Sequence, residues 1–314
     1  MASSPSKKGI YNAIVLQNRS LGDKFFRLSL ELEKKAHIPF SHTSAGQFVE
    51  IDVSKLALPI EKLIPGQFSD AALRNVILRR PFSFSDIDCS KDCTVVEILY
   101  CVLGPATLRM KTLRTGDTVN LIGPLGTGFT ISEDKKSAIL IAGGMGAPPL
   151  IHLAKVLKKQ YPDTEITAFV GAKTKDDLAF FDIKTDKLKK KTDITLEEFA
   201  RHNIKAFIST DDGSAGFKGF ITEKFKTWLC ENKPNGKNTI IYSCGPEAML
   251  SATAALSGEF KIPCQVSLER RMACGIGLCQ SCAVKCLDKT SGNISYKLCC
   301  KDGPVFWSDE VVWQ

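Results

Sequence analysis

Residues 137–160 read SAILIAGGMGAPPLIHLAKVLKKQ, and this stretch decides the fold class of the chain. It opens with an apolar run of the kind found in buried strands, and that run ends in glycine. From residue 147 onward the apolar residues recur at helix-like spacing. A strand, a glycine-rich turn and a helix in this order predict one unit of a doubly wound parallel sheet.

The same alternation continues toward the C-terminus. Two further strand-like runs follow, EITAFVGA at 165–172 and KAFIST at 205–210, and then a helical stretch at 222–230. The run NTIIYSCGP at 238–246 is again apolar and is closed by Gly-Pro. We therefore expect residues 133–260 to form one α/β domain with a doubly wound parallel sheet.

The sequence before this domain has a different pattern of apolar residues. Short apolar or alternating runs, such as YNAIVLQN and TVVEILYCVL, are separated by Gly, Pro, Asn and Asp. This spacing predicts an antiparallel barrel or sandwich, and of the two we expect a β-barrel over residues 10–132, as the family resemblance given below implies. Residues 54–72 interrupt the pattern with Pro59, Pro65 and Gly66, and we expect a long loop there.

Composition sets limits on function. The chain has 314 residues, of which 44% are hydrophobic and 24% charged, so it suits two or three domains with cores of their own. No apolar run reaches the roughly 18 residues of a membrane span, and the start MASSPSKKGI lacks the apolar core of a secretory signal. We expect a cytoplasmic protein. The net charge of +8 comes from lysines that are scattered or lie in the run 187–191, without the aromatic residues of a nucleic-acid platform.

Twelve cysteines are many for a cytoplasmic chain, and half of them crowd the tail. The run CGIGLCQSC gives Cys274-x4-Cys279-x2-Cys282, the spacing of a plant-type 2Fe–2S cluster, which needs one further cysteine. Zinc is the alternative, although paired zinc knuckles normally show two C-x2-C pairs. The candidates for the fourth ligand are Cys286, Cys299 and Cys300. Residues 261–314 are too short for an independent core, so we expect a small cluster domain held together by its metal.

Two further groups of residues point to cofactors. The segment Arg80-Pro81-Phe82-Ser83 ends a strand. Its arginine can bind a pyrophosphate, and its serine can hydrogen-bond the edge of a flavin ring. A glycine-rich turn, GPLGTGF, follows at 123–129. Glycines after the strand at 137 let backbone N–H groups approach a dinucleotide, although they do not match the G-x-G-x-x-G fingerprint. A second turn follows the strand at 239, where such sheets receive ligands. These two turns comprise Gly143, Gly144 and Gly146, and Cys244, Gly245 and Pro246.

Taken in order, RPFS, GPLGTGF, GGMGAPP and CGPEAM resemble the ferredoxin–NADP reductase superfamily, and this likeness covers about residues 10–314. The tail, ERRMACGIGLCQSC followed by CKDGPVF, is similar to the electron-transfer subunit of the NAD-linked type of dihydroorotate dehydrogenase. The resemblance implies FAD on the barrel at Arg80 and Ser83, and at Gly104 and Thr107 of the turn GPAT, where relatives commonly have a GKGT-like turn. It implies NAD(H) at the two turns of the second domain, and Cys300 as the fourth cluster ligand.

The resemblance also implies a reaction and a partner. A catalytic subunit with its own FMN would oxidise dihydroorotate, and this chain would pass the electrons through its 2Fe–2S cluster and FAD to NAD⁺ in pyrimidine biosynthesis. A heterotetramer with two copies of each subunit is implied, and no residue of this chain is identified as a catalytic acid or base. The segments 54–72 and 186–201 look like insertions.

Two alternatives share the same motifs. The small subunit of an NADH-dependent ferredoxin–NADP oxidoreductase or of a sulfide dehydrogenase would share every motif, and the tail CKDGPVF is what favours the dihydroorotate dehydrogenase subunit. Lys173 and Lys175, which follow the strand at 165–172, would favour the 2′-phosphate of NADP.

Overall fold

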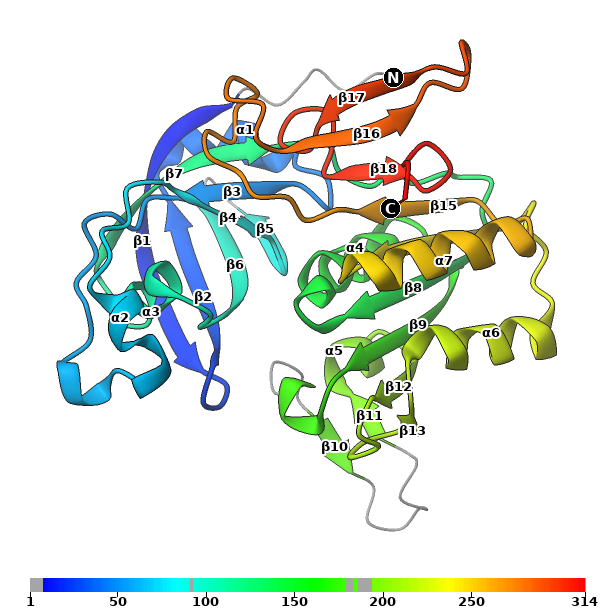
Figure 1. Cartoon of the computed structure of the whole chain (residues 1–314), viewed down its shortest axis with the longest axis horizontal. Coiled ribbons are helices and arrows are strands. Elements are labelled where there is room, and N and C mark those ends of the chain that lie inside the picture. The colour runs from blue at the N-terminus through cyan, green and yellow to red at the C-terminus, as the bar shows by residue number, and fades with distance from the viewer. Residues whose placement is uncertain (1–7, 91–92, 179–182, 186–193, 314) are drawn as a thin grey trace.

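The computed structural model describes residues 8–90, 93–178, 183–185 and 194–313, which form two large sheets and two small ones (Figure 1). The lysine run at 187–191, and the first half of the segment predicted as an insertion at 186–201, lie outside the described residues. Within them, no helix is long and apolar enough to cross a membrane.

The first large sheet is antiparallel and has seven strands in the order β4-β3-β7-β1-β2-β6-β5. The sheet curls, so that Phe82 of β4 and Tyr100 of β6 meet edge to face with 6.3 Å between ring centroids. This is the predicted barrel. Its elements are β1 (Gly9–Ser20), β2 (Phe25–Leu32), α1 (His37–Ser41), β3 (Phe48–Ile51), α2 (Ser69–Ala72), β4 (Arg80–Ser83), β5 (Asp86–Ser90), β6 (Cys93–Cys101), α3 (Pro105–Met110) and β7 (Thr118–Leu125).

Alternation of side chains explains the barrel core. Along β1 and β2 every second residue is buried, as expected for strands with one face on the core. Val15, Leu28 and Leu30 have no exposed surface. Residues 54–72 form a long connection between β3 and β4, as predicted, although it ends in the short helix α2.

The second large sheet has the order β13-β12-β9-β8-β14-β15-β18 and is parallel except for its last pair. The helices α4 and α5 pack on one face, and α6 and α7 on the other (Figure 1). The predicted doubly wound domain is thus confirmed. Its elements are β8 (Ser137–Gly143), α4 (Ala147–Gln160), β9 (Glu165–Ala172), α5 (Glu197–Ala200), β12 (Lys205–Thr210), β13 (Phe217–Lys218), α6 (Ile221–Asn232), β14 (Thr239–Cys244), α7 (Glu247–Glu259), β15 (Cys264–Ser267) and β18 (Val305–Trp307).

The order of strands places a ligand-binding crevice. From β8 the chain proceeds outward through β9 and β12, and it then returns to the other side of β8 as β14. The strand order therefore reverses between β8 and β14, and ligands of such sheets bind beyond the carboxyl ends of the strands at this point. The two predicted nucleotide turns follow these two strands.

The cysteine-rich tail is joined to the second sheet at both ends. β15 pairs in parallel with β14, and β18 pairs antiparallel with β15. Between them lie the cysteine loop and a hairpin of β16 (Ala283–Leu287) and β17 (Ile294–Leu298). The predicted cluster domain at 261–314 thus shares its first and last strands with the second sheet. The remaining small sheet pairs β10 (Ile183–Thr185) with β11 (Ile194–Leu196).

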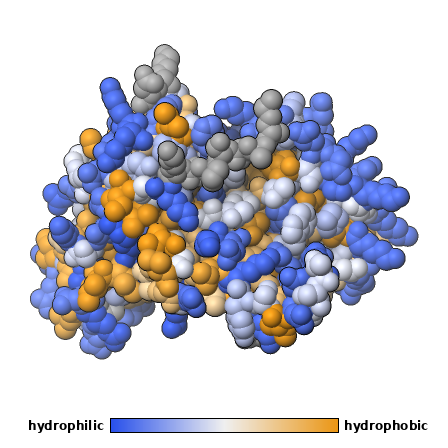
Figure 2. All heavy atoms as spheres, turned by 90° about the horizontal axis from the view of Figure 1, so that it is seen from above, coloured by the Kyte–Doolittle hydropathy of each residue, from blue (hydrophilic) through white to orange (hydrophobic). Residues whose placement is uncertain are grey.

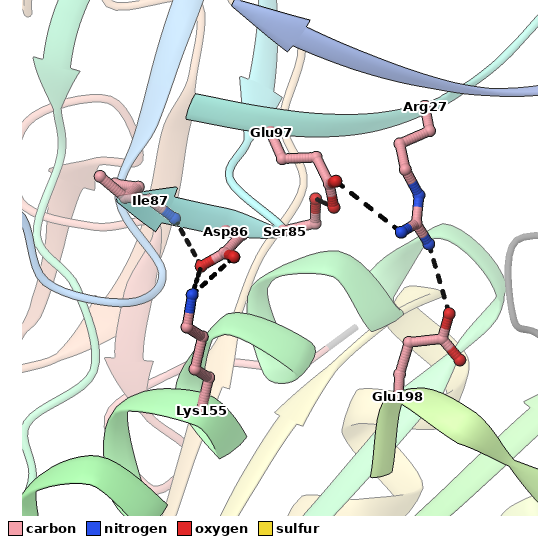
Figure 3. A network of polar contacts seen from close by, with 7 residues as sticks. All are labelled: Arg27, Ser85, Asp86, Ile87, Glu97, Lys155 and Glu198. Atoms are coloured by element: carbon pink, nitrogen blue, oxygen red, sulfur yellow. Dashed lines mark hydrogen bonds and ion pairs between the residues drawn. The ribbon is translucent and has the colours of Figure 1, made fainter. Parts of the chain in front are cut away.

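Ion pairs join the barrel to the second sheet (Figure 3). The guanidinium of Arg27 on β2 lies 3.7 Å from Glu97 of β6 and 3.3 Å from Glu198 of α5. Lys155 of α4 donates to both oxygens of Asp86 at 2.6 and 2.7 Å. The two domains are therefore held in a fixed orientation by polar contacts on the side where α4 faces the barrel.

Candidate redox site

One cavity lies where the barrel, the second sheet and the cysteine-rich tail meet. It encloses about 310 Å³, at the lower end of the roughly 300–1,000 Å³ of small-molecule pockets. Its walls come from β3, β4 and β6, from the first residues of α4, and from the residues after β15. The predicted residues that line it are Pro81, Phe82, Ser83, Thr107 and Cys244.

The barrel wall of this cavity includes residues that the sequence analysis missed. Leu99, Tyr100 and Cys101, at the end of β6, line it beside Phe82. The hydroxyl of Tyr100 donates to Asn18 at 3.1 Å, which satisfies the only polar group of this buried ring. β6 leads directly into the turn at Gly104, and this continuity is the sequence signal that could have indicated its last residues.

Arg80 and Gly104 lie next to the cavity and outside its lining. Nη1 of Arg80 donates to the carbonyls of Leu78 and Arg79 at 2.8 and 3.0 Å. The Oγ1 of Thr107 accepts the backbone N–H groups of Leu103 and Gly104 at 3.0 and 3.3 Å and so fixes the turn. A Cβ on Gly104 would meet no atom within 4 Å, so the backbone of this turn is open to a ligand.

The two turns of the second domain pack against each other. A Cβ on Gly146 would lie 2.1 Å from the carbonyl oxygen of Cys244, so only glycine allows this close approach. Gly144, with φ of +50°, has open space on its side-chain face. Met145, Pro148 and Cys244 line the cavity. Burial raises the pKa of the Cys244 thiol to about 12, so this group stays protonated at neutral pH.

The predicted cluster ligands lie in two pairs. The Sγ of Cys274 accepts the backbone N–H of Cys279 at 3.4 Å, and the Sγ of Cys282 accepts the backbone N–H of Cys300 at the same distance. Two pairs of thiolates suit a cluster with two irons, because each iron takes two cysteines.

Hydrogen bonding prepares one of these sulfurs as a ligand. The Cys279 thiol is exposed and lies 3.2 Å from the hydroxyl of Ser281. Hydrogen bonds from Ser281 and Cys274 lower its pKa to about 6. The thiolate, which is the form that binds metal, is thus available at neutral pH.

The adjacent cysteines of the tail face different surroundings. Cys299 donates its S–H to the carbonyl of Leu268 at 3.4 Å, away from the cysteine loop. Burial, followed by the hydrogen bond with Cys282, raises the pKa of Cys300 to about 12, and the backbone of Gly277 in the cysteine loop opposes this shift. Cys286 is buried on β16. The backbone N–H of Cys299 donates to the carbonyl of Cys282 at 3.0 Å, but of these three residues Cys300 is the one that hydrogen-bonds a sulfur of the cysteine loop.

A second site residue was missed by the sequence analysis. Glu50 of β3 has no exposed surface, and neither carboxylate oxygen has a hydrogen-bond partner among the described residues. It lies beneath the cysteine loop at Gly275. Burial raises the pKa of its carboxyl. The one available signal was a charged residue between the apolar Val49 and Ile51 of the strand QFVEIDV.

Comparison with protein families gives two matches. Residues 269–312 match the family described as the iron-sulfur cluster binding domain of dihydroorotate dehydrogenase B, and residues 140–255 match the oxidoreductase NAD-binding domain. The first match covers the cysteine loop and Cys300. It favours an iron–sulfur cluster over the zinc alternative.

Curated relatives extend this likeness to the whole chain. The chain is 32% identical to the dihydroorotate dehydrogenase B (NAD(+)), electron transfer subunit, of Caldanaerobacter subterraneus, over 96% of this chain and 98% of that protein. It is 40% identical to a probable subunit of the same name from Methanocaldococcus jannaschii, over 79% of this chain and 80% of that protein.

Solved structures agree on the fold. A structure of the NADH-dependent reduced ferredoxin–NADP oxidoreductase matches with a TM-score of 0.70 and 26% identity, covering 96% of this chain and 90% of that one. A ferredoxin NADP⁺ reductase from Neisseria gonorrhoeae, with bound FAD and NADP, matches with a TM-score of 0.55 and 16% identity, over 80% of this chain and 91% of that one.

These findings confirm the resemblance, the fold class and the set of cofactors: FAD, a 2Fe–2S cluster and NAD(H). The chain is an oxidoreductase component that transfers electrons. It belongs to the family of electron transfer subunits of dihydroorotate dehydrogenase B (NAD(+)).

Proposed function

We propose that this chain carries electrons from a dihydroorotate dehydrogenase catalytic subunit that holds FMN, through its 2Fe–2S cluster and FAD, to NAD⁺. The complex would be a heterotetramer with two copies of each subunit, working in pyrimidine biosynthesis in the cytoplasm. The names of the relatives support the partner, because all those cited are electron transfer subunits of this enzyme.

The observation that carries the proposal is the composition of the cavity wall. Residues of the flavin strand β4, of the nucleotide turns and of the tail that bears the cysteines line the same space of about 310 Å³. A flavin is needed between the other two groups, because a nicotinamide exchanges two electrons as a hydride while an iron–sulfur cluster exchanges one at a time. This arrangement suits an electron relay better than a single-cofactor enzyme.

The barrel residues would bind and orient FAD. Ser83 and the face of Phe82 line the cavity and would hold the ring system, with Pro81 beside them. Arg80 would turn from its carbonyl partners toward the pyrophosphate, because a guanidinium binds phosphate through two parallel hydrogen bonds. Gly104 and Thr107 would bring backbone N–H groups to the same group.

The second domain would present the nicotinamide to the flavin ring. Gly143, Gly144 and Gly146 would admit the nucleotide to the backbone at the end of β8, and the turn of Cys244, Gly245 and Pro246 would close the other side. The cavity wall at Met145, Pro148 and Cys244 is mostly apolar and would exclude water from the transfer.

The four cysteines would hold the cluster at the partner-facing side. Cys274 and Cys279 would bind one iron, and Cys282 and Cys300 the other. Leu278, 77% exposed in the cysteine loop, and Ile10 and Ile14 of β1 are large apolar residues open to solvent. Figure 2 shows hydrophobic side chains gathered on the barrel side of the molecule, and such patches mark protein interaction sites.

Co-expression with the catalytic subunit tests the proposal. We expect the pair to co-purify, to show flavin and iron–sulfur absorption that bleaches on adding NADH, and to reduce NAD⁺ when dihydroorotate is supplied. Bleaching by NADH without any dihydroorotate-dependent activity in a complex with a competent FMN subunit would contradict the choice of partner. A colourless protein would contradict the relay as a whole.

A second candidate is favoured by one observation. The structure of the ferredoxin–NADP oxidoreductase covers nearly the whole chain. A small subunit of that type, or of a sulfide dehydrogenase, would use the same cofactors with another partner. Reduction of NADP⁺ that requires both NADH and reduced ferredoxin distinguishes it, and preference for NADP over NAD would assign Lys173 and Lys175 a role.

A further inference from the structure

The buried carboxyl of Glu50 is the most unusual polar group of the described residues near the cavity. Its exposed fraction is 0%, and both oxygens lack a hydrogen-bond partner. A buried carboxyl group without a partner costs several kcal/mol, roughly, and persists only where something compensates it. The surroundings of Glu50 therefore indicate what it binds in the working protein.

The cysteine loop packs against this carboxyl. A Cβ added to Gly275 would lie 2.5 Å from Cδ and 2.6 Å from Oε1 of Glu50. The carboxyl thus packs directly against the residue that follows the cluster ligand Cys274. Figure 1 shows the segment between β15 and β16, coloured orange, passing over this end of the barrel.

The positive charges of Arg79 and Arg80 partly offset the effect of burial on Glu50, but the hydrogen bonds of these arginines go to other acceptors. Arg79 donates to the side chain and the carbonyl of Asn120 at 2.6 and 3.2 Å. Nη1 of Arg80 is held by the carbonyls of Leu78 and Arg79. By contrast, the backbone N–H of Gly275 has no hydrogen-bond acceptor within the described residues. Gly275 packs against Glu50, so a backbone donor without an acceptor belongs to the residue next to an acceptor without a donor.

Glu50 also has a fixed relation to the flavin strand. In the pairing of β3 with β4, Glu50 lies opposite Pro81. The next residue, Ile51, lies opposite Arg80, and Phe48 lies opposite Ser83. Phe48, on the same face of β3, lines the cavity. One short strand therefore touches both the flavin side and the cluster side.

We propose that Glu50 is a positioning residue of the iron–sulfur centre: its carboxyl accepts a backbone hydrogen bond from the cysteine loop at Gly275, and so fixes the cluster relative to the flavin strand. This inference rests on the proposed function. Glu50 acts through the loop and does not itself bind iron.

Substitution at position 50 tests this inference in the full chain. Glu50→Leu keeps the volume and removes the acceptor, while Glu50→Gln keeps one acceptor oxygen. We expect Glu50→Leu to retain FAD but to lose at least half of its iron and acid-labile sulfide per FAD, with a broadened electron paramagnetic resonance signal after reduction. Glu50→Gln should match the wild-type chain in both measurements.

Two further variants control for the loss of a buried carboxyl and for a failure to fold. Glu198→Leu removes another buried carboxyl, on α5, and should leave the iron content per FAD and the resonance signal unchanged. Where Glu50→Leu does not fold, Glu50→Ala replaces it, because a smaller side chain cannot collide with Gly275.

The outcomes separate this inference from the proposed function. A Leu or Ala variant with wild-type iron content and an unchanged signal overturns it, and so does a Gln variant that loses as much cluster as the Leu variant. A wild-type chain that purifies with FAD but without iron overturns the proposed function and this inference together.

Discussion

At the scale of single residues, neighbours in the sequence have different surroundings that the sequence leaves undecided. Alternation in a strand predicts that only one of Cys299 and Cys300 faces the cysteine loop, but it does not say which. In the structure both lie in the turn after β17, Cys299 toward Leu268 and Cys300 beside Cys282. The other three ligands could be assigned from the spacing Cys274-x4-Cys279-x2-Cys282 alone, because they lie in one short loop.

Replacing the last ligand should separate the two cysteines. We expect Cys300→Ser to lose the cluster, with iron per FAD falling at least fivefold, because serine binds iron much less well than a thiolate. FAD should remain bound. The matched control is Cys299→Ser, which keeps a donor for the carbonyl of Leu268 and should keep the cluster. The reverse result, measured by iron analysis and visible absorption, would exclude Cys300 as a ligand.

A methyl group on Gly146 should interfere with nucleotide binding. The added Cβ would meet the carbonyl oxygen of Cys244 at 2.1 Å, so the two turns must move apart. We expect Gly146→Ala to slow the reduction of FAD by NADH at least tenfold in stopped-flow measurements. Gly258→Ala on α7 is the control: its Cβ meets nothing, and it should raise stability by about 0.5–1 kcal/mol. Unchanged NADH kinetics in Gly146→Ala would contradict the assignment.

At the scale of elements, periodicity predicted strands and helices better than it predicted irregular segments. β9 has the predicted residues 165–172, and α6 extends the predicted helix at 222–230 by only a few residues. α3 was missed because GPAT reads as a turn, although proline is favoured at the first helical position. In the connection between β3 and β4, order depends on a contact with a distant residue, Arg109, which local sequence does not reveal.

Arg109 ties this connection to α3. Its guanidinium, largely buried, donates to the carbonyls of Ala72 and Arg74 at 3.3 and 3.2 Å and to Pro105 at 3.0 Å. Hydrogen bonds from a charged donor contribute about 1.5–3 kcal/mol each. We expect Arg109→Met to lower the free energy of unfolding by about 2 kcal/mol and to speed hydrogen exchange of the peptide that contains residues 72–74.

The exposed Arg114, five residues further along the chain, provides the control. Arg114→Met should leave both the stability and the exchange of this peptide within error of the wild-type chain. Equal effects of the two substitutions would show that the contacts of Arg109 do not hold the connection.

At the scale of the whole molecule, the domain order could be predicted from the sequence, but the contacts between domains could not. Motif order predicted a barrel, then a doubly wound sheet, then a cysteine-rich tail. The contacts in Figure 3 join residues far apart in the sequence, such as Arg27 and Glu198, and no local pattern encodes them. The same holds for the pairing of β15 with β18 across the cysteine loop.

The Arg27 contacts should contribute to stability of the joined domains. Its side chain is 17% exposed and that of Glu198 only 2%. Removing one partner of a buried ion pair costs about 3–5 kcal/mol. We expect Arg27→Met to lower the free energy of unfolding by about 3 kcal/mol in urea titrations. Lys24→Met, at the more exposed pair with Asp177, should cost less than about 1 kcal/mol, and equal losses would contradict the difference in burial.

His152 of α4 predicts how stability depends on pH. Burial lowers its pKa from 6.5 to about 4, and Nδ1 has no partner among the described residues. Below pH 6.5 the unfolded chain binds a proton here that the folded chain does not bind until about pH 4. Stability should therefore fall as the pH drops through this window, by up to about 3 kcal/mol in total.

Urea unfolding at pH 7.5 and pH 5 measures this effect. We expect His152→Leu to lose less stability between these two pH values than the wild-type chain, because leucine does not titrate. If the two proteins lose stability equally, the pH dependence arises from other groups.

The return of β18 to the second sheet also affects the behaviour of the chain outside its complex. An exposed sheet edge offers unpaired N–H and C=O groups to other chains and promotes aggregation. β18, a strand of only 3 residues, covers β15 and takes its place at the edge of the sheet, and it begins shortly after Cys300. The segment that completes the ligand set thus also covers β15. A chain that fails to close its cysteine loop would leave β15 as an unpaired edge strand that can pair with other chains. Faulty cluster assembly would then lead to self-association and removal of the protein instead of accumulation of an inactive subunit.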